Sequence, residues 1–368
     1  MTLTVSLAHR FAGFSIDVGF EAPPGVTALF GRSGAGKTTV VNAVAGLLRP
    51  DRGRIALDGA VLLDTEAGVF VPPHRRRIGY VFQEGRLFPH LSVRRNLLYG
   101  RWFAPRGAPG AGLERIVELL GLGPLLDRAP GALSGGEKQR VALGRAILAK
   151  PRMLLMDEPL AALDAARKDE ILPYLGRLRD ETRLPILYVS HSAAEVARLA
   201  TTLVLLEAGR VIAAGPAAEV LSDPAAAPAF GLREAGAILT ARVEAHEADG
   251  LSRLAVSAGP LWLPQVAAPV GARLRLRLLA QDVMLALARP EGVSALNVLP
   301  AVVREVRLGE GPGALVRLAA GEDLLLARVT RRSAEALGLV PGCEVHAVLK
   351  AVSVAPGSVG AGPASAEA

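Results

Sequence analysis

The stretch GRSGAGKTT, residues 31–39, decides the fold of this chain. It fits the pattern G-x-x-x-x-G-K-[ST], in which a glycine-rich loop turns its backbone N–H groups onto phosphate oxygens. Within that pattern Lys37 reaches the β- and γ-phosphates and Thr38 binds Mg²⁺. The alternative is a glycine-rich turn that carries a surface lysine.

The segments on either side favour the phosphate-binding interpretation. GVTALF, residues 25–30, is a short apolar run that predicts a buried strand, and TVVNAVAGLL after the loop has helical character. A strand that leads through such a loop into a helix places the phosphates at a helix N-terminus, where free N–H groups and the helix dipole favour anions. The sequence therefore predicts an α/β fold with a nucleotide at this loop.

Two more apolar runs would bring polar residues to the same edge of the sheet. MLLM, residues 153–156, ends in Asp157 and Glu158, and PILYVSH, residues 185–191, ends in His191. Open α/β sheets bind ligands at the carboxyl ends of their strands. There Asp157 would hold Mg²⁺, Glu158 would orient the attacking water, and His191 would contact the γ-phosphate. Solvated acids at a strand end and a structural histidine are the alternatives.

LSGGEKQR, residues 133–140, contains more glycine than a helix start needs. Ser134 and Glu137 fit a capping box, and VALGRAILA continues as an amphipathic helix. Capping does not explain Gly135 and Gly136, because each glycine weakens a first helical turn by about 1 kcal/mol relative to alanine. Close approach of a bulky anion explains them.

In this order the segments resemble the nucleotide-binding subunit of an ATP-binding cassette (ABC) transporter, over residues 1 to about 230. The resemblance implies an α/β P-loop NTPase fold with a helical subdomain. It also implies a homodimer that holds two ATP molecules head to tail, each completed by the partner's signature residues. Those residues are Ser134, Gly135, Gly136 and Glu137, of which Glu137 stands where the family usually has Gln.

The resemblance assigns further roles, with ATP and Mg²⁺ as the cofactors. It implies three catalytic residues: Glu158, His191 and, in the Q-loop YVFQ, Gln83. It implies three residues for Mg²⁺: Thr38, Gln83 and Asp157. Asp164 ends the D-loop. The adenine would stack on Phe11, with Phe14 as the competitor and a core role for either ring as the alternative. The other nucleotide-binding residues form the loop: Gly31, Arg32, Ser33, Gly34, Ala35, Gly36, Lys37, Thr38 and Thr39.

Composition and charge narrow the class of protein. The chain has 368 residues, of which 51% are hydrophobic and 21% charged, a globular balance with room for two or three domains. The single cysteine, Cys343, excludes a disulfide within the chain. The net charge of +7 comes without a basic tail or stacking motif, and aromatic residues make up only 4%, so we expect no nucleic-acid partner.

The sequence also predicts where the protein resides. It contains no stretch of the ~18 apolar residues that a membrane span needs, and its amino terminus lacks a signal-peptide pattern. We therefore expect a peripheral protein on the cytoplasmic face of the inner membrane, attached through its partners.

A surface for a membrane partner is predicted at residues 83–91. EGRLFPHLSVRRNLLYG combines apolar residues that look exposed, among them Leu87 and Phe88, with a helix cap at Ser92. An apolar patch on a soluble domain often marks a partner site, and an ordinary connecting loop is the alternative. In ABC importers the corresponding stretch receives the coupling helix of the transmembrane permease subunit.

The pattern changes after the cassette. Residues 221–236 are rich in Ala and Pro and are interpreted as a linker. ARLRLRLL, residues 272–279, alternates Arg and Leu, which predicts a strand with one buried and one solvated face. AVVREVRL, ALVRLA, DLLLARVT and EVHAVLKAVSV follow, with a helix-like RRSAEALGL between the last two. Short strands at this spacing predict a small, OB-like antiparallel barrel.

We therefore expect four parts: an ABC ATPase domain (1–230), a linker and accessory β region (231–290), a barrel (291–355) and a disordered tail (356–368).

The barrel resembles the molybdenum-binding, Mop-type domain through SALN, residues 294–297, and GLVPGCEVHAVLKAVSV, residues 338–354. Behind this cassette it is similar to the ATPase subunit of a molybdate importer. That implies permease subunits and, indirectly, a periplasmic or extracellular molybdate-binding protein as partners. Ser294 and Lys350 would hold the dianion, or are ordinary barrel-end residues. The family motif carries Arg where this chain has Leu296.

Other functions remain as alternatives. Tungstate, sulfate, ferric-iron and polyamine importers share the cassette, and only the carboxyl-terminal region separates them. A soluble, non-transport ABC ATPase predicts tandem cassettes or a coiled-coil insertion, and this chain has neither. An oxyanion-binding regulator built around the barrel would not need the complete set of catalytic residues.

Overall fold

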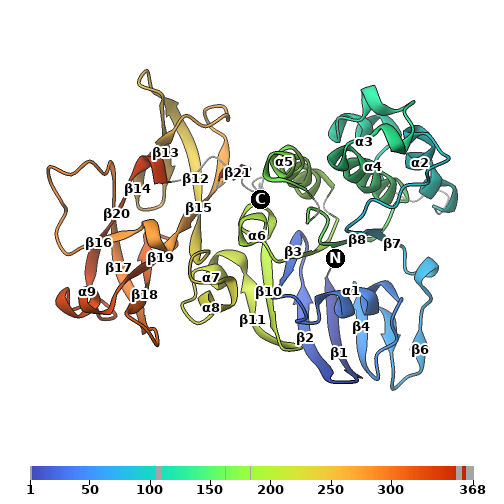
Figure 1. Ribbon diagram of the computed structural model, residues 1–368, viewed down its shortest axis with the longest axis horizontal. Coiled ribbons are helices and arrows are strands. Elements are labelled where there is room, and N and C mark those ends of the chain that lie inside the picture. Colours follow the sequence, from blue (N-terminus) through green and yellow to red (C-terminus); the bar gives the residue numbers. More distant parts are fainter. Residues whose placement is uncertain (1, 105–109, 162, 183, 354–358, 362–368) are drawn as a thin grey trace. The chain divides into compact units, whose positions relative to one another are not determined.

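The computed structural model consists of two compact units (Figure 1). It describes residues 2–104, 110–161, 163–182, 184–353 and 359–361. The first unit comprises Met1–Ser192 and Leu199–Ala214, and the second comprises Ala193–Arg198 and Gly215–Ala368. Among the described residues, we find no helix with the length and apolar content of a membrane span.

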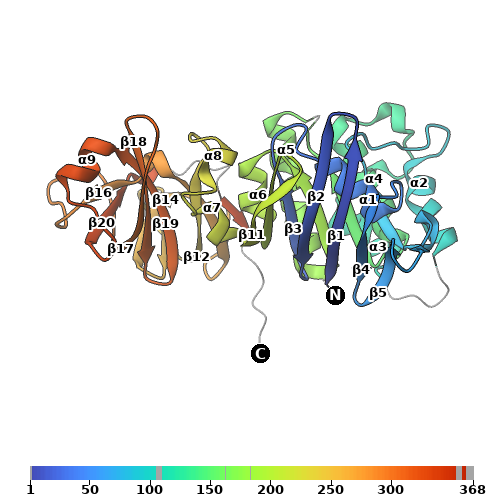
Figure 2. The same cartoon turned by 90° about the horizontal axis from the view of Figure 1, so that it is seen from below.

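The first unit is built on one mixed sheet. Its strands are β1 (Leu3–Phe11), β2 (Phe14–Ala22), β3 (Val26–Phe30), β4 (Arg52–Leu57), β5 (Ala60–Asp64), β6 (Val69–Phe70), β7 (Ile78–Val81), β8 (Met153–Asp157), β9 (Ile186–Ser190), β10 (Thr202–Glu207) and β11 (Arg210–Pro216). The sheet has eleven strands in the order β6-β5-β4-β1-β2-β11-β10-β3-β9-β8-β7. The part from β10 to β7 is parallel. Figure 2 shows the antiparallel strands β1, β2 and β4.

Helices of the first unit connect these strands. The α-helices are α1 (Lys37–Ala45), α2 (Val93–Tyr99), α3 (Leu113–Leu119), α4 (Gly135–Leu148) and α5 (Ala165–Thr182). Short 3-10 helices are η1 (Pro73–Arg75), η2 (Gly100–Phe103), η3 (Gly123–Leu125) and η4 (Pro130–Ala132). Helices α2, α3 and α4 lie together in Figure 1 and form the expected helical subdomain.

The central parallel strands divide their side chains between two cores. Leu154 and Met156 of β8 lie in a cluster with residues of α2 to α5, whereas Met153 and Leu155 lie in a cluster with residues of α1. Strand β9 alternates in the same way. Because both faces are buried, each strand is a continuous apolar run, as the sequence predicts. The predicted strands at 25–30 and 153–156 and the helix after the loop are therefore confirmed.

The second unit is mainly β. Its strands are β12 (Gly236–His246), β13 (Leu251–Val256), β14 (Gly259–Pro264), β15 (Arg273–Leu279), β16 (Met284–Ala286), β17 (Asn297–Leu308), β18 (Gly313–Ala320), β19 (Asp323–Thr330), β20 (Glu344–Leu349) and β21 (Val359–Ala361). Its helices are α6 (Ala193–Leu199), α7 (Ala217–Leu221), α8 (Ala227–Phe230), α9 (Arg331–Ala336), η5 (Ala280–Asp282) and η6 (Ala351–Ser353). The last residue of α6, Leu199, belongs to the first unit. An α/β part followed by an all-β part confirms the predicted fold class.

Two five-stranded sheets share the core of this unit, in the orders β14-β13-β12-β15-β21 and β16-β20-β17-β18-β19. One cluster contains buried residues from both sheets, such as Leu276 and Val316. Asn297, which is fully buried, joins the sheets through its side chain: its Oδ1 accepts from the backbone N–H of Trp262 at 2.7 Å, and its Nδ2 donates to the carbonyl of Trp262 at 2.9 Å. The amide thereby satisfies backbone groups of the edge strand β14.

The alternating strand β15 departs from its expected form. Its arginines at 275 and 277 are only 7% and 9% exposed, so the predicted solvated face is wrong. Strand β15 lies inside a sheet, between β12 and β21. Arg277 is compensated there, because it donates to the carbonyl and to the carboxylate of Glu234, both at 2.6 Å.

Two other expectations for this unit differ from the structure. The segment interpreted as a linker contains α8 and buried residues, including Ala227 and Ala235, because its alanines pack against the β-structure. Within the tail expected to be disordered, Val359–Ala361 form β21 and pair with β15. The rest of residues 356–368 lies outside the described residues. The predicted domain boundaries stay predictions.

Candidate functional site

The glycine-rich loop lies between β3 and α1, where the sequence predicts it. Gly34 and Gly36 have φ values of +82° and +100°, which side chains other than glycine rarely adopt. A Cβ atom on Gly34 would meet no atom within 4 Å, so the loop is open on that side. The Lys37 Nζ donates to the carbonyls of Gly31 and Arg32, at 2.7 and 3.1 Å. The loop thus holds a cation beside backbone N–H groups of the kind that bind anions.

The carboxyl ends of β8 and β9 bring the predicted polar residues to this lysine. Glu158 Oε1 lies 3.8 Å from Lys37 Nζ and 3.3 Å from His191 Nδ1. Asp157 precedes Glu158 and accepts a hydrogen bond from the Tyr80 hydroxyl at 3.3 Å. Lys37, Glu158 and His191 therefore form one contact chain across three parallel strands.

Burial sets the electrostatics of this cluster. It raises the pKa of Asp157 above its ordinary value, and the neighbouring Glu158 adds to the effect. It lowers the pKa of Lys37, against the opposing attraction of the two carboxylates. Burial and the Asp157 carboxylate raise the pKa of Tyr80, which keeps its proton for donation. A cation beside Asp157 would lower the free-energy cost of burying its charged carboxylate.

The donor set beside the loop fits a hard divalent cation. Asp157 supplies carboxylate oxygens, and the exposed Thr38 supplies a hydroxyl that lowers the pKa of the same carboxyl group. Oxygen ligands of this kind suit Mg²⁺, which usually takes few protein ligands and completes its shell with phosphates and water. Gln83, the third residue predicted for the metal, is exposed in the loop that follows β7.

The signature segment forms the start of α4. The capping box is confirmed in both halves, since Ser134 Oγ accepts from the N–H of Glu137 at 3.2 Å and Glu137 Oε2 accepts from the N–H of Ser134 at 2.7 Å. Ser134 and Gly135 are exposed at this helix start. In the D-loop, Asp164 Oδ1 accepts from the N–H of Arg167 at 2.9 Å and caps α5. These residues are accessible for contact with another molecule.

Two residues that sequence reasoning missed attach the Q-loop to α4. Gln139 Nε2 donates to the carbonyl of Phe82 at 3.2 Å, and Arg145 donates to the carbonyls of Gly85 and Arg86, at 3.2 and 3.0 Å. A Cβ atom on Gly85 would lie 3.1 Å from the carbonyl of Lys138, also on α4. The segment after β7 is therefore bound to the signature helix. The sequence gives no clear signal of this role, because Gln139 and Arg145 stand among other polar residues of α4.

The residues predicted to dock a permease are less exposed than expected. Leu87 packs on the core of the helical subdomain, and Phe88 lies 4.3 Å from the ring centroid of Tyr99, with the Arg145 guanidinium 5.3 Å above its ring. Both side chains are half-buried. The predicted cap is confirmed, because Ser92 accepts from the N–H of Arg95.

Tyr80 is a further residue that sequence reasoning missed. It lies on β7, its hydroxyl contacts Asp157, and its ring stacks on Phe82 with centroids 4.1 Å apart. The Arg86 guanidinium lies over the ring of Phe82, 4.4 Å from its centroid. A tyrosine in a buried strand gives no signal of this role, since its partner is 77 residues away in sequence.

The two phenylalanines proposed for the adenine differ in exposure. Phe11 is 39% exposed, whereas Phe14 is partly buried and packs on the core of the first unit. Their rings stack with centroids 6.3 Å apart. Phe11 is therefore the ring with a face open to a ligand.

The predicted oxyanion residues lie in the second unit. Ser294 precedes β17 and Lys350 follows β20, and both are exposed. Asn297 pairs with Leu349 in the ladder between these strands, so Ser294 and Lys350 flank the same end of the ladder.

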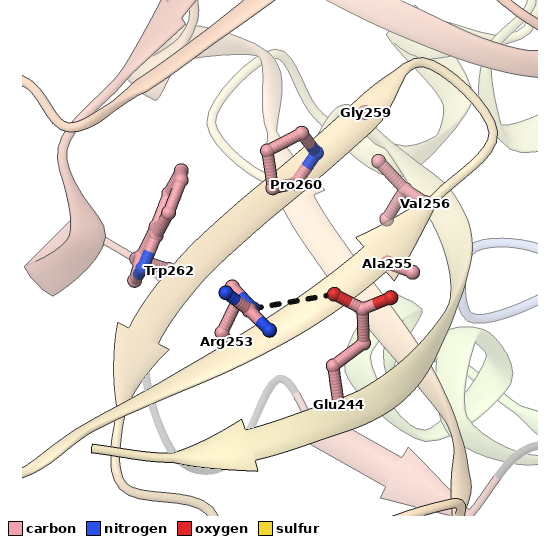
Figure 3. A pocket seen from close by; sticks show the side chains of 7 residues that line it. All are labelled: Glu244, Arg253, Ala255, Val256, Gly259, Pro260 and Trp262. Atoms are coloured by element: carbon pink, nitrogen blue, oxygen red, sulfur yellow. Dashed lines mark ion pairs between the residues drawn. The ribbon is translucent and has the colours of Figure 1, made fainter.

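A hollow of about 530 Å³ lies elsewhere in this unit, on β12, β13 and β14 (Figure 3). Its lining residues are Glu244, Arg253, Ala255, Val256, Gly259, Pro260 and Trp262. Arg253 and Glu244 form an ion pair of 3.3 Å across it. Because the carboxylate neutralises the guanidinium, the hollow does not favour an anion.

Comparisons with known proteins agree with the geometry of both units. The profile of the ABC transporter family matches residues 17–161, and the profile of the TOBE domain matches residues 293–356. Two solved structures resemble the first unit, each with 26% identity and a TM-score of 0.52. One is cbiO1 from Clostridium perfringens, part of the ABC transporter complex cbiONQ, and covers 63% of this chain and 94% of that one. The other is MJ1267, an ATP-binding cassette in its ADP conformation, and covers 62% and 98%.

Curated relatives align with nearly the whole chain. Molybdenum import ATP-binding protein ModC of Rhizobium meliloti is 56% identical over 356 residues, which cover 96% of this chain and 99% of the relative. The protein of the same name from Paramagnetospirillum magneticum is 51% identical over 358 residues, with coverage of 97% and 99%. The likeness therefore includes both units.

Proposed function

The chain belongs to the molybdenum import ATP-binding proteins, which are ABC transporter ATPases, and we propose from this membership that it hydrolyses ATP to drive molybdate uptake across the cytoplasmic membrane. One observation carries the catalytic part: Lys37, Glu158 and His191 form a contact chain at the carboxyl ends of parallel strands. The names of relatives that match over both units support the choice of molybdate.

ATP would bind with its phosphates in the glycine-rich loop and its base on Phe11. The proposed phosphate ligands are the residues from Gly31 to Thr39, with Lys37 as the cation. Mg²⁺, when bound, would offset charge on the phosphates, and its proposed ligands are Thr38, Asp157 and Gln83.

Hydrolysis itself would fall to two side chains. Glu158, held between Lys37 and His191, would orient water for attack on the γ-phosphate and accept its proton. His191 would donate to the γ-phosphate oxygens. The half-buried Tyr80 would keep Asp157 oriented by its hydrogen bond.

The working form is proposed to be a homodimer. The exposed start of α4 offers Ser134 and Gly135 to a second molecule, and backbone N–H groups at a helix start favour an anion. These residues, with Gly136 and Glu137, would complete the partner's ATP site, and Asp164 would lie at the same junction.

The remaining partners are transmembrane permease subunits, which would dock at residues 83–91, on the cytoplasmic face of the membrane. A separate binding protein outside that membrane would deliver the oxyanion. Ser294 and Lys350 would form an oxyanion site of the second unit, where charge-assisted hydrogen bonds suit a dianion.

Uptake by cells that lack this chain tests the proposal. Deletion should abolish uptake of labelled molybdate from dilute medium, and the intact chain should restore it. Lys37→Ala should fail to restore uptake, because the lysine supplies the charge contact to the phosphates. Lys168→Ala, which changes a half-buried lysine on α5, is the matched control and should restore it. Loss of sulfate uptake with normal molybdate uptake would assign the other substrate, and a fully active Lys37→Ala chain would overturn the nucleotide site.

A further inference from the structure

A chain of ring contacts leads away from the glycine-rich loop. Phe14 lies against the loop, since a Cβ atom on Gly36 would come within 3.4 Å of its ring. Phe11 stacks on Phe14 at an interplanar angle of 25° and is the more exposed of the two. The two residues pair across the end of the β1–β2 hairpin. Phe11 therefore presents a ring face next to the site proposed for the phosphates.

The His9 ring lies against this phenyl ring. The rings of His9 and Phe11 have centroids 4.4 Å apart and are nearly perpendicular, at 86°, which is the favourable edge-to-face geometry. The His9 side chain is only 16% exposed, so it lies below the surface on which Phe11 opens. A phenyl ring at a hairpin end would otherwise rotate among several orientations.

The Asp51 carboxylate lies beside His9 in turn. Its Oδ1 lies 3.1 Å from His9 Nδ1, and its Oδ2 accepts from the backbone N–H of Arg10 at 2.8 Å. That N–H, more than any other group, holds the pKa of Asp51 below its ordinary value, so the group is a carboxylate at neutral pH. Asp51 directly precedes β4, which pairs with β1 in the sheet. The carboxylate is therefore anchored to the strand that carries His9 and Phe11.

We propose that His9, which lies beside Asp51, is a positioning residue for the nucleotide base: it fixes the Phe11 ring in the orientation on which a purine stacks. The inference rests on the proposed function, since only a nucleotide-binding chain has a base to place there. His9 itself does not touch the nucleotide. Its effect is preorganisation, because a ring already fixed loses less freedom when the base stacks on it.

Calorimetric titration of the full chain with two ligands tests this role. ATP carries a base, whereas inorganic tripolyphosphate offers only the phosphates. His9→Ala should weaken ATP affinity by about three- to tenfold, the size of one aromatic contact, and leave tripolyphosphate affinity unchanged. His9→Phe, which keeps an aromatic edge beside Phe11, should retain most of the ATP affinity. The exposed His74→Ala is the matched control and should change neither affinity.

A double-mutant cycle separates positioning from a general structural effect. In a Phe11→Ala background, His9→Ala should cause no further loss of ATP affinity, because its target is already gone. A full additional loss there, an equal loss for both ligands, or unchanged ATP affinity in His9→Ala would overturn the inference. Should His9→Ala fail to fold, Asp51→Asn at the surface carries the same test. A wild-type chain that binds no ATP would instead overturn the proposed function.

Discussion

Glu158 combines an unusual backbone with a central place among the site residues. Its φ of +46° lies in the left-handed region, which costs a residue other than glycine about 1 kcal/mol or more. Its N–H donates to the carbonyl of Val189 at 3.1 Å, which holds the turn after β8 in place. This turn aims the carboxylate at Lys37 and His191.

Glu158→Gln should abolish ATP turnover yet leave ATP binding intact, because the amide keeps the shape of the side chain but accepts no proton from water. An ATP-loaded dimer should then accumulate, which light scattering after gel filtration would detect. Glu170→Gln, an exposed change on α5, is the control and should hydrolyse normally. Rapid hydrolysis by Glu158→Gln would remove this residue from its proposed role.

Glu137 should contribute a pH-dependent part of the stability of α4. The N–H of Ser134, its main partner, lowers the pKa of Glu137 from its ordinary value of 4.5. A lowered pKa means that the contribution is complete above the carboxyl pKa of the unfolded chain and is lost as pH falls through the folded value. The free energy of unfolding of the wild-type chain should therefore exceed that of Glu137→Gln by less than about 1 kcal/mol near pH 7. This difference should become smaller as the pH falls.

Urea unfolding at several pH values measures this difference. Glu114→Gln is the control, because Glu114 lies in the first turn of α3 but its N-cap, Gly112, has no side chain to complete a capping box. A difference between wild type and Glu137→Gln that does not change with pH would contradict the expected linkage.

How much of the site could be predicted depended on the distance in sequence that each contact spans. Lys37, Asp157 and Glu158 could be named because each belongs to a short motif at the end of an apolar run. Arg145 could not, because its partners in the Q-loop are 59 and 60 residues away. His9 was missed for the same reason, because His9 lies on β1 and its neighbour Asp51 lies far along the sequence, just before β4.

At the scale of elements, a buried arginine closes the end of α1. Arg76, 1% exposed, donates through Nη1 to the carbonyls of Ala43 and Val44, at 2.7 and 2.8 Å. Its Nε donates to the carbonyl of Val71 at 2.7 Å. Burial lowers the pKa of Arg76 to about 10, so the cation persists at neutral pH and complements the negative end of the helix.

Arg76→Met should lower the free energy of unfolding by about 2–4 kcal/mol, because three carbonyls lose a charged donor in a buried place and, among the described residues, only that of Ala43 has a second donor, the N–H of Gly46. Chemical denaturation at pH 7 would measure the loss. Arg75→Met is the matched control, since this neighbour is exposed and the change should stay within about 0.5 kcal/mol. Equal stability of the two variants would show that the carbonyls find other partners.

A strand could be predicted where its own burial determines its pattern of apolar residues. The apolar runs of β3, β8 and β9 identified themselves, because both of their faces are buried. The exposure of β15 could not be predicted, because β21 lies about eighty residues further along the chain and pairs with it there. The alternation of Arg and Leu predicts a strand, but it does not predict which other strands cover the polar face of that strand.

At the scale of the whole molecule, the bond between Q-loop and α4 links the proposed permease surface to the signature residues. Residues 83–91 begin beside Phe82, which Gln139 holds, and Arg145 holds the next turn. A movement of the permease at this surface should therefore shift the start of α4, where Ser134 lies. In the proposed assembly, the same element would face both the ATP of a partner and the membrane subunit.

The double variant Leu87→Ser, Phe88→Ser should keep ATP binding and lose molybdate uptake, because it removes apolar area from the permease surface but leaves the phosphate loop intact. ATP titration and cellular uptake give the two readouts. Thermal unfolding serves as the control, since both side chains also pack on the helical subdomain. Normal uptake by a stably folded variant would contradict the docking surface.

The amide of Asn297 has a consequence for the nascent chain. Its two bonds to Trp262 cross 35 residues of sequence, so β14 leaves the ribosome well before the group that closes its edge. At about 5–20 residues per second, synthesis leaves this edge uncovered for a few seconds. During that interval the outer edge of β14, whose other edge pairs with β13, can template intermolecular pairing. Aggregation during overexpression should begin there.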